Sequence, residues 1–329
     1  AALSGDWTPP ALEKASAPAT ATAPDQPIGM TDEQIDNLVR RTYQYVAMFN
    51  VINKGAMMEG NPSRTGWNGT HASPGLLDHT MKAIARPNND TLYITSILDL
   101  RNDAVVVSYP AFDSKFVCLE TSAYDHYCDI PLSTTKGDFK KPTKLLYYTE
   151  RTKGYGGDPV EGVDRVIEMS GDFVIVFLRV MPHAAEPERF EKILGAMKEV
   201  QAVTLSEHLG QPPKTVEAAQ FPDFQASDAA IYENNFLEVM QFVVNHTTFD
   251  TADEMDAAVL AALKPLGIEP GKPFDPQSAE AIDGKALAVA ARKVHQEALE
   301  TWVSPEAEAM LNELFLPKGE MTLEAMVLQ

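Results

Sequence analysis

The spacing of the hydrophobic positions changes along the chain, and its clearest change marks a region of β-strands. Between residues 92 and 180, β-branched and aromatic residues come in short runs that Gly, Pro, Asn and Asp residues interrupt. The expected strands are residues 92–100, 104–109, 116–123, 145–148, 163–169 and 173–180. Because no helical pattern lies between these runs, the sequence predicts an antiparallel β unit over residues 86–182, sandwich-like or jelly-roll-like in arrangement.

On both sides of the β unit, apolar residues recur about every 3.6 positions, which indicates α-helices. In residues 30–85, a first helix begins at Thr31, which has capping-box spacing to Gln34, and ends at Gly55. A short helix is also expected at 76–85, and the helices of residues 183–329 are expected at 186–209, 227–246, 252–263, 278–302 and 305–315. Thr251 and Glu254 predict a capping box for the helix at 252–263. The fold expected is α+β, with a β middle flanked by helical N-terminal and C-terminal regions.

The composition predicts an N-terminal tail and excludes nucleic acid and anionic lipid as partners. Residues 1–29 are rich in Ala, Pro and Thr with almost no bulky apolar residues, so we expect a disordered or extended tail. The chain carries 47 acidic and 27 basic residues, and its net charge of -20 repels nucleic acid and anionic lipid. No run approaches the roughly 18–20 apolar residues of a transmembrane helix. The start at Ala1 predicts a removed signal peptide, and hence a periplasmic or secreted protein.

The densest group of reactive side chains is the stretch from Arg86 to Tyr93, which reads Arg-Pro-Asn-Asn-Asp-Thr-Leu-Tyr. Its Asn and Asp side chains can hydrogen-bond their own backbone, so the stretch predicts a rigid turn at the start of a strand. We expect Asp90 to be buried and bonded to backbone N–H groups or to Arg86. One interpretation of the stretch is a functional site, and the other is an Asx-turn that only begins a strand.

Local spacing shows no preformed metal or nucleotide site. The chain has no GxGxxG, P-loop, GxSxG or HExxH motif, and no His-x-His or His-x-x-x-His pair. A metal site would need His71, His79 and His126 to converge with the turn at 88–90, whose oxygen atoms suit calcium or another hard cation. Cys118 and Cys128 fit no zinc pattern. They either form a local disulfide across a turn, or Cys118 is a buried free thiol.

Several motifs together resemble a known family. They are the stretch 86–93, the strand that closes in Asp99-Leu100, the stretch Lys-Phe-Val-Cys-Leu-Glu-Thr-Ser-Ala-Tyr-Asp-His-Tyr at 115–127, the Thr-rich turn at 133–137, and Phe177-Leu-Arg179. In this combination, residues 30–210 resemble the bacterial family catalogued as domain of unknown function 1254. The resemblance implies an exported α+β protein that contains a jelly-roll and has a polar cluster at the turn. Members commonly continue into a companion domain of unknown function 1214, which we expect to be absent here.

Two functions of different classes follow from these observations. The first is an exported, acidic envelope protein that acts as a binding or assembly module through its β unit, either as a homo-oligomer or with a protein partner. The alternative is a hydrolase- or lyase-type enzyme for a small or carbohydrate-like substrate.

The enzyme hypothesis assigns roles to particular residues. Asp90 or Asp125 would act as general base, and Tyr93 or His126 as acid. The candidate ligand-binding residues are Arg86, Asn88, Asn89, Thr91 and Arg179. An enzyme requires at least two of Asp90, Asp125 and His126 in one accessible pocket, whereas a binding or assembly module does not.

Overall fold

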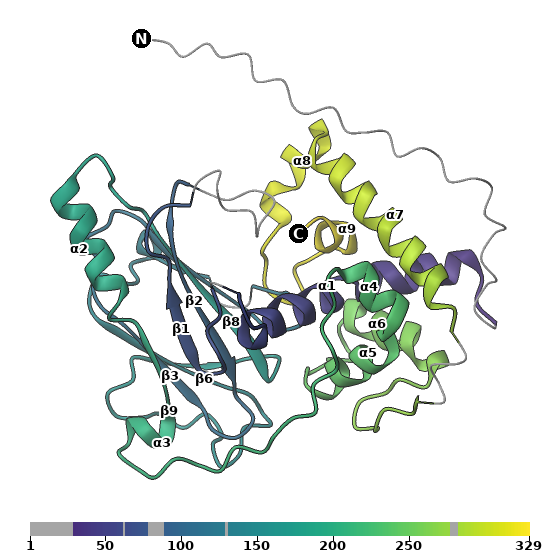
Figure 1. Ribbon diagram of the computed structural model, residues 1–329, viewed down its shortest axis with the longest axis horizontal. Helices are drawn as coiled ribbons and strands as arrows, with labels where there is room; N and C mark the ends of the chain where they lie inside the picture. The colour runs from purple at the N-terminus through teal and green to yellow at the C-terminus, as the bar shows by residue number, and fades with distance from the viewer. Residues whose placement is uncertain (1–28, 62, 78–88, 129–130, 277–281) are drawn as a thin grey trace.

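The β-strands and most of the helices occupy opposite ends of the molecule. The computed structural model describes residues 29–61, 63–77, 89–128, 131–276 and 282–329. Two sheets lie at one end and a group of helices at the other, with α2 on the far side of the sheets (Figure 1). Helices come both before and after the strands in the sequence, which confirms the mixed α+β class. Among the described helices, none combines the length and the apolar character that crossing a bilayer requires.

The described strands form two open sheets. Sheet A has the order β1-β2-β8-β4-β5, and sheet B has the order β7-β6-β3-β9. The strands are β1 Gly69–Ala72, β2 Leu92–Asp99, β3 Val105–Tyr109, β4 Val117–Ser122, β5 Leu132–Ser133, β6 Thr143–Tyr148, β7 Arg165–Glu168, β8 Phe173–Val180 and β9 Gln201–Thr204. The inner faces of both sheets contribute to one hydrophobic core, with Leu98 and Val176 from sheet A and Val107 and Leu145 from sheet B.

The strand pairing corrects one part of the prediction. β6 and β7 run parallel, whereas the other pairs in the two sheets are antiparallel. The expectation of a wholly antiparallel unit was therefore wrong at this pair. The connection at 149–164 is long enough to return the chain to the starting end of β6, as a parallel neighbour requires.

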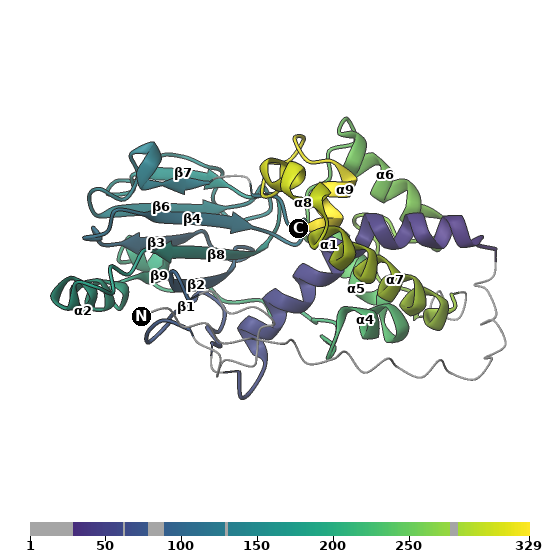
Figure 2. The ribbon, with the colours of Figure 1, turned by 90° about the horizontal axis from the view of Figure 1, so that it is seen from above.

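Most of the helices form the second part of the molecule, whereas α2 and α3 pack against the sheets. The helices are α1 Asp32–Met57, α2 Pro187–Met197, α3 Leu205–His208, α4 Asp228–Asn234, α5 Phe236–Asn245, α6 Glu254–Leu263, α7 Gly284–Trp302, α8 Pro305–Met310 and α9 Leu323–Leu328. The view from above shows α1 running through the helical part towards the sheets (Figure 2). Its predicted capping box is present, with the Gln34 N–H donating to Thr31 Oγ1 and the Thr31 N–H donating to Gln34 Oε1.

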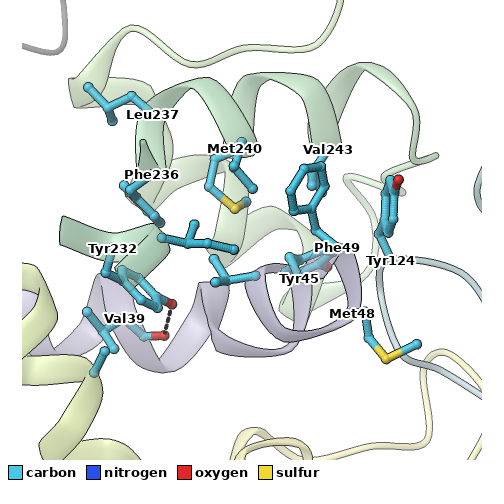
Figure 3. Packing of buried hydrophobic residues seen from close by; sticks show 14 of the residues in the cluster. Val39, Tyr45, Met48, Phe49, Tyr124, Tyr232, Phe236, Leu237, Met240 and Val243 are labelled. Atoms are coloured by element: carbon cyan, nitrogen blue, oxygen red, sulfur yellow. Dashed lines mark hydrogen bonds between the residues drawn. The ribbon is translucent and has the colours of Figure 1, made fainter. Parts of the chain in front are cut away.

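The helical part has its own core around α1 and α5. Tyr45 and Phe49 of α1 lie towards Met240 and Val243 of α5 (Figure 3), and all four are buried. The Tyr232 hydroxyl donates to the backbone oxygen of Val39 at 3.2 Å, which ties α4 to α1. The periodic apolar positions of 227–246 therefore belong to the core of the helical part.

Several predicted boundaries were wrong, two of them because short strands are defined by pairing with distant strands. The sheets extend beyond 86–182, since β1 precedes that range and β9 follows it. The expected helix at 186–209 ends at Met197, because Gln201–Thr204 pairs with β3. The expected helix at 227–246 breaks at Asn235, where φ is -150°. The helix at 252–263 is capped by Asp253 rather than by Thr251. The expected helix at 76–85 lies almost wholly outside the described residues.

Candidate functional site

The two faces of sheet A have different surroundings. Successive side chains of a strand point to opposite faces, so Leu92, Ile94 and Leu98 of β2 enter the core shared with sheet B. Tyr93, Thr95 and Ile97 therefore point to the other face. At one end of that outer face, Ile97 packs in the core of the helical part, and with it Phe173 of β8. The helical part thus covers one end of the outer face.

The other end of the outer face carries half-buried side chains that belong to neither core. We call this group the open sheet face; it consists of Tyr93, Thr95, Cys118, Glu120, Phe177 and Arg179. The strand register arranges them in two rows. Tyr93, Arg179 and Cys118 lie opposite one another on β2, β8 and β4, and Thr95, Phe177 and Glu120 form the next row. Two residues selected from the sequence, Tyr93 and Arg179, are thus direct cross-strand neighbours.

Contacts within the open sheet face hold its charged and aromatic groups together. The Arg179 guanidinium lies 3.2 Å from the Glu120 carboxylate. The same guanidinium lies over the Phe177 ring, 5.5 Å from its centroid. The Tyr93 and Phe177 ring centroids are 5.0 Å apart, with an interplanar angle of 34°. The result is a compact group in which a cation and a carboxylate compensate each other beside an aromatic pair.

Two titratable groups, one on the open sheet face and one on the neighbouring strand β1, favour their uncharged forms. Burial raises the pKa of the Cys118 thiol, and the nearby Glu120 charge adds to the effect. The thiol is therefore a poor nucleophile, since the thiolate is the reactive form. His71 on β1 lies opposite Thr95, and burial lowers its pKa, which favours the uncharged imidazole. Cys118 and Cys128 are not joined by a disulfide in the structure, and Cys118 is half-buried.

The turn before β2 is placed differently from the expectation. Asn89 and Asp90 are exposed, and Thr91 is half-buried. The prediction that Asp90 is buried was wrong, because the residues just before β2 lie at the surface of the molecule. Arg86 and Asn88 lie outside the described residues, as does His79.

Asp125 and His126 follow the far end of β4. Asp125 is fully buried, whereas His126 is half-buried and has a left-handed backbone with φ of 64°. Burial lowers the pKa of His126 to about 4. Asp90 precedes the start of β2, which aligns with the start of β4, so the length of β4, roughly 16 Å, separates Asp90 from Asp125. The structure therefore does not bring Asp90 together with Asp125 and His126.

A buried carboxylate that we did not select from the sequence joins the two parts of the molecule. Asp172, at the start of β8, accepts hydrogen bonds from Thr149 Oγ1 at 3.0 Å and Arg151 Nε at 2.8 Å. His246, at the end of α5, places Nδ1 2.8 Å from the same carboxylate. In the sequence, Gly171-Asp172 is one of the Gly and Asp interruptions between the expected strands, so the local signal indicated a turn rather than a network.

Two other features of the described residues do not support a binding or metal site. A surface hollow of about 700 Å³ opens at the start of α2, but its Arg189 already pairs with Asp113 and Glu186. Within the described ranges, no three His, Cys, Asp or Glu side chains are grouped so that they could hold a metal ion. The expected cation ligands at 88–90 fall partly outside those ranges, so that expectation remains a prediction.

Comparison with known proteins gives a family match over both sheets and a likeness of fold over most of the chain. Residues 67–202 match the family described as "Protein of unknown function (DUF1254)", which confirms the predicted resemblance. The chain is similar to the crystal structure of the VPA0106 protein from Vibrio parahaemolyticus, with 21% identity and a TM-score of 0.62, over 90% of this chain and 65% of that chain. A crystal structure of an uncharacterized protein from Burkholderia cenocepacia matches at 11% identity and a TM-score of 0.30, over 82% of this chain and 59% of that chain. No curated protein matches. The Vibrio likeness shows a shared fold, and this chain spans 65% of that protein's length.

Proposed function

Since the residues that match the DUF1254 family include every strand of the open sheet face, we propose that the protein is a binding module that holds its ligand on this face. The observation that carries the proposal is the row of Tyr93 and Arg179, with Glu120 and Phe177 in the next row. Aromatic, cationic and anionic groups converge there on three strands that one sheet holds in register. In this proposal the two sheets act as a jelly-roll-like sandwich that presents the face.

A blocking substitution tests the proposal. Thr95 lies in the second row of the open sheet face, directly beside Phe177, so Thr95→Trp covers part of the face with a large side chain. A panel of sugars and organic acids is screened for compounds that raise the melting temperature, because a ligand of the folded state stabilises it. We expect Thr95→Trp to abolish the shift.

A matched control separates blocking from general damage. Thr143 is another half-buried strand threonine, but it lies on β6 of sheet B. Thr143→Trp should therefore keep the ligand-induced shift. If Thr95→Trp responds to the ligand as the unmodified protein does, the ligand binds elsewhere and the proposal fails.

The enzyme alternative has one observation in its favour, namely that Tyr93 and Arg179 share the face with the carboxylate Glu120. A hydrolase or lyase built on this face would use Glu120 as base and Tyr93 as acid, with Arg179 holding the substrate. Asp90 and Asp125 stand apart from each other, so a mechanism that needs both finds no support. Glu120→Gln would then abolish turnover of the bound compound, whereas a binding module shows no turnover in either form.

The proposal also includes export of the protein and its association with itself or with a protein partner. Phe116 and Met181 are exposed at 36% and 40%, and the Met181 N–H donates to the Phe116 oxygen at the end of the open sheet face. Such neighbouring apolar side chains support self-association or a protein partner at this edge. Light scattering tests this, because a mass that stays at 36.0 kDa over a range of concentrations would argue against self-association.

Cell fractionation tests the proposed export, which rests on the acidic composition and the Ala/Pro-rich residues 1–29.

A further inference from the structure

The pairing of charges on the open sheet face indicates which class of ligand it takes. We infer that the ligand is a neutral oligosaccharide, held by the Arg179–Glu120 pair beside the Tyr93 ring. This inference rests on the proposed function, because it assumes that the open sheet face is the binding site.

The charges favour an uncharged ligand. The Arg179 guanidinium, 3.2 Å from the Glu120 carboxylate, is already compensated. The pair still offers several N–H donors and carboxylate acceptors side by side, which suits adjacent hydroxyl groups that both donate and accept. A carboxylate ligand would instead have to compete with Glu120 for Arg179, and it would approach a chain with a net charge of -20. The face is therefore polar without attracting anions.

The aromatic pair supplies the apolar part of the site. Phe177 lies under the Arg179 guanidinium and 5.0 Å from the Tyr93 ring, so it positions both groups. Tyr93 is half-buried and belongs to neither hydrophobic core. The C–H groups on one side of a sugar ring can pack on an aromatic ring of this kind while the hydroxyl groups at its edge reach Arg179, and a neighbouring sugar unit reaches Glu120.

The span of the face fits more than one sugar unit. Tyr93 on β2 and Glu120 on β4 are separated by β8. Two strand spacings amount to about 10 Å, and the two residues also lie in different rows. An oligosaccharide can contact both ends of this span at once, whereas a single sugar ring would reach only one of them.

Calorimetric titration with defined sugars tests the inference. The probes are maltotriose and cellotriose, which are neutral, and trigalacturonate, which has the same number of sugar units but carries carboxylates. We expect at least one neutral trisaccharide to bind and trigalacturonate to bind at least about tenfold more weakly. Tyr93→Ala should lower the affinity for the neutral sugar by about tenfold. Tyr93→Phe keeps the ring and should lower this affinity by less than about threefold.

Two further variants make the result specific. Tyr155 is a half-buried tyrosine whose ring lies 5.2 Å from that of Tyr148, outside the open sheet face, so Tyr155→Ala should leave the affinity unchanged. Glu120→Gln leaves Arg179 uncompensated, so it should raise the affinity for trigalacturonate relative to the neutral sugars. Melting curves identify any variant that fails to fold, and in that case Tyr93→Phe and Glu120→Gln carry the test.

The outcomes separate this inference from the proposed function. If trigalacturonate binds more tightly than the neutral sugars and Thr95→Trp removes that binding, the open sheet face is a site but the inference is overturned. If no neutral trisaccharide binds, the inference is likewise overturned, and the wider ligand panel decides the proposed function. If a neutral sugar binds and Thr95→Trp has no effect, the open sheet face is not the site and both fail.

Discussion

Removing the carboxylate of Asp172 should weaken the connection between the sheets and the helices. The side chain is only 2% exposed and lies within hydrogen-bonding distance of Thr149, Arg151 and His246. The backbone adds to the connection, since the Asp172 N–H donates to the His246 oxygen at 2.9 Å. β8 and α5 are therefore joined through one residue.

The expected cost of Asp172→Ala follows from the groups left behind. The Thr149 hydroxyl and the Arg151 guanidinium each lose an acceptor, although Arg151 keeps Glu150 and Thr248. Breaking a buried ion pair costs about 3–5 kcal/mol. The Arg151 side chain is 29% exposed, so water can replace part of the interaction. We therefore expect Asp172→Ala to lower the free energy of unfolding by about 3 kcal/mol, at the lower end of that range. Asp172→Asn keeps one acceptor and should cost about 1–2 kcal/mol.

Urea unfolding followed by circular dichroism measures this loss as a change in the midpoint at constant slope. Glu150→Ala is the matched control, since Glu150 contacts the same Arg151 and Thr248 but its side chain is 54% exposed. A surface pair of this kind contributes at most about 1 kcal/mol. If Asp172→Ala costs no more than Glu150→Ala, the buried network does not hold the two parts together.

Elements with strong local signals were predicted well. The capping box at Thr31 fixes the start of α1, and the strand predicted at 173–180 agrees with β8 at both ends. β1 and β9 were missed because each has four residues and is defined by pairing with a strand from another part of the sequence. Local pattern carries no information about such a partner.

The candidate site was predicted only in part, for a related reason. The sequence drew attention to the contiguous stretch 86–93, but the structure gathers its polar and aromatic groups across strands. Tyr93 and Arg179 were selected, whereas Glu120 and Phe177 were noted only as part of the family resemblance. Their proximity depends on β8 lying between β2 and β4, an order that does not follow the sequence. Period-two alternation tells which residues share a face, but the register between distant strands decides which of them meet.

The remaining predictions concern stability. A Cβ on Gly284 would lie 2.1 Å from the Glu233 oxygen, so Gly284→Ala should cost about 1–3 kcal/mol by overpacking. A Cβ on Gly195 in α2 would meet nothing within 4 Å, so Gly195→Ala should raise the free energy of unfolding by about 0.5–1 kcal/mol through helix propensity. Thermal unfolding compares the two variants, and equal effects would contradict the steric argument. The last prediction concerns Asp256, which is fully buried: burial raises its pKa above the ordinary value of about 3.9, although Lys318 partly opposes the shift. The Asp256 carboxyl group therefore keeps its proton to a higher pH in the folded state than in the unfolded state. The stability that the protonated carboxyl group contributes is present below pH of about 4 and is lost as the pH rises through the folded-state pKa. Asp256→Asn has no such titration, so the stability of the unmodified protein relative to this variant should fall as the pH rises above about 4 in urea unfolding. A difference that stays constant or grows would show that burial does not dominate at this carboxylate.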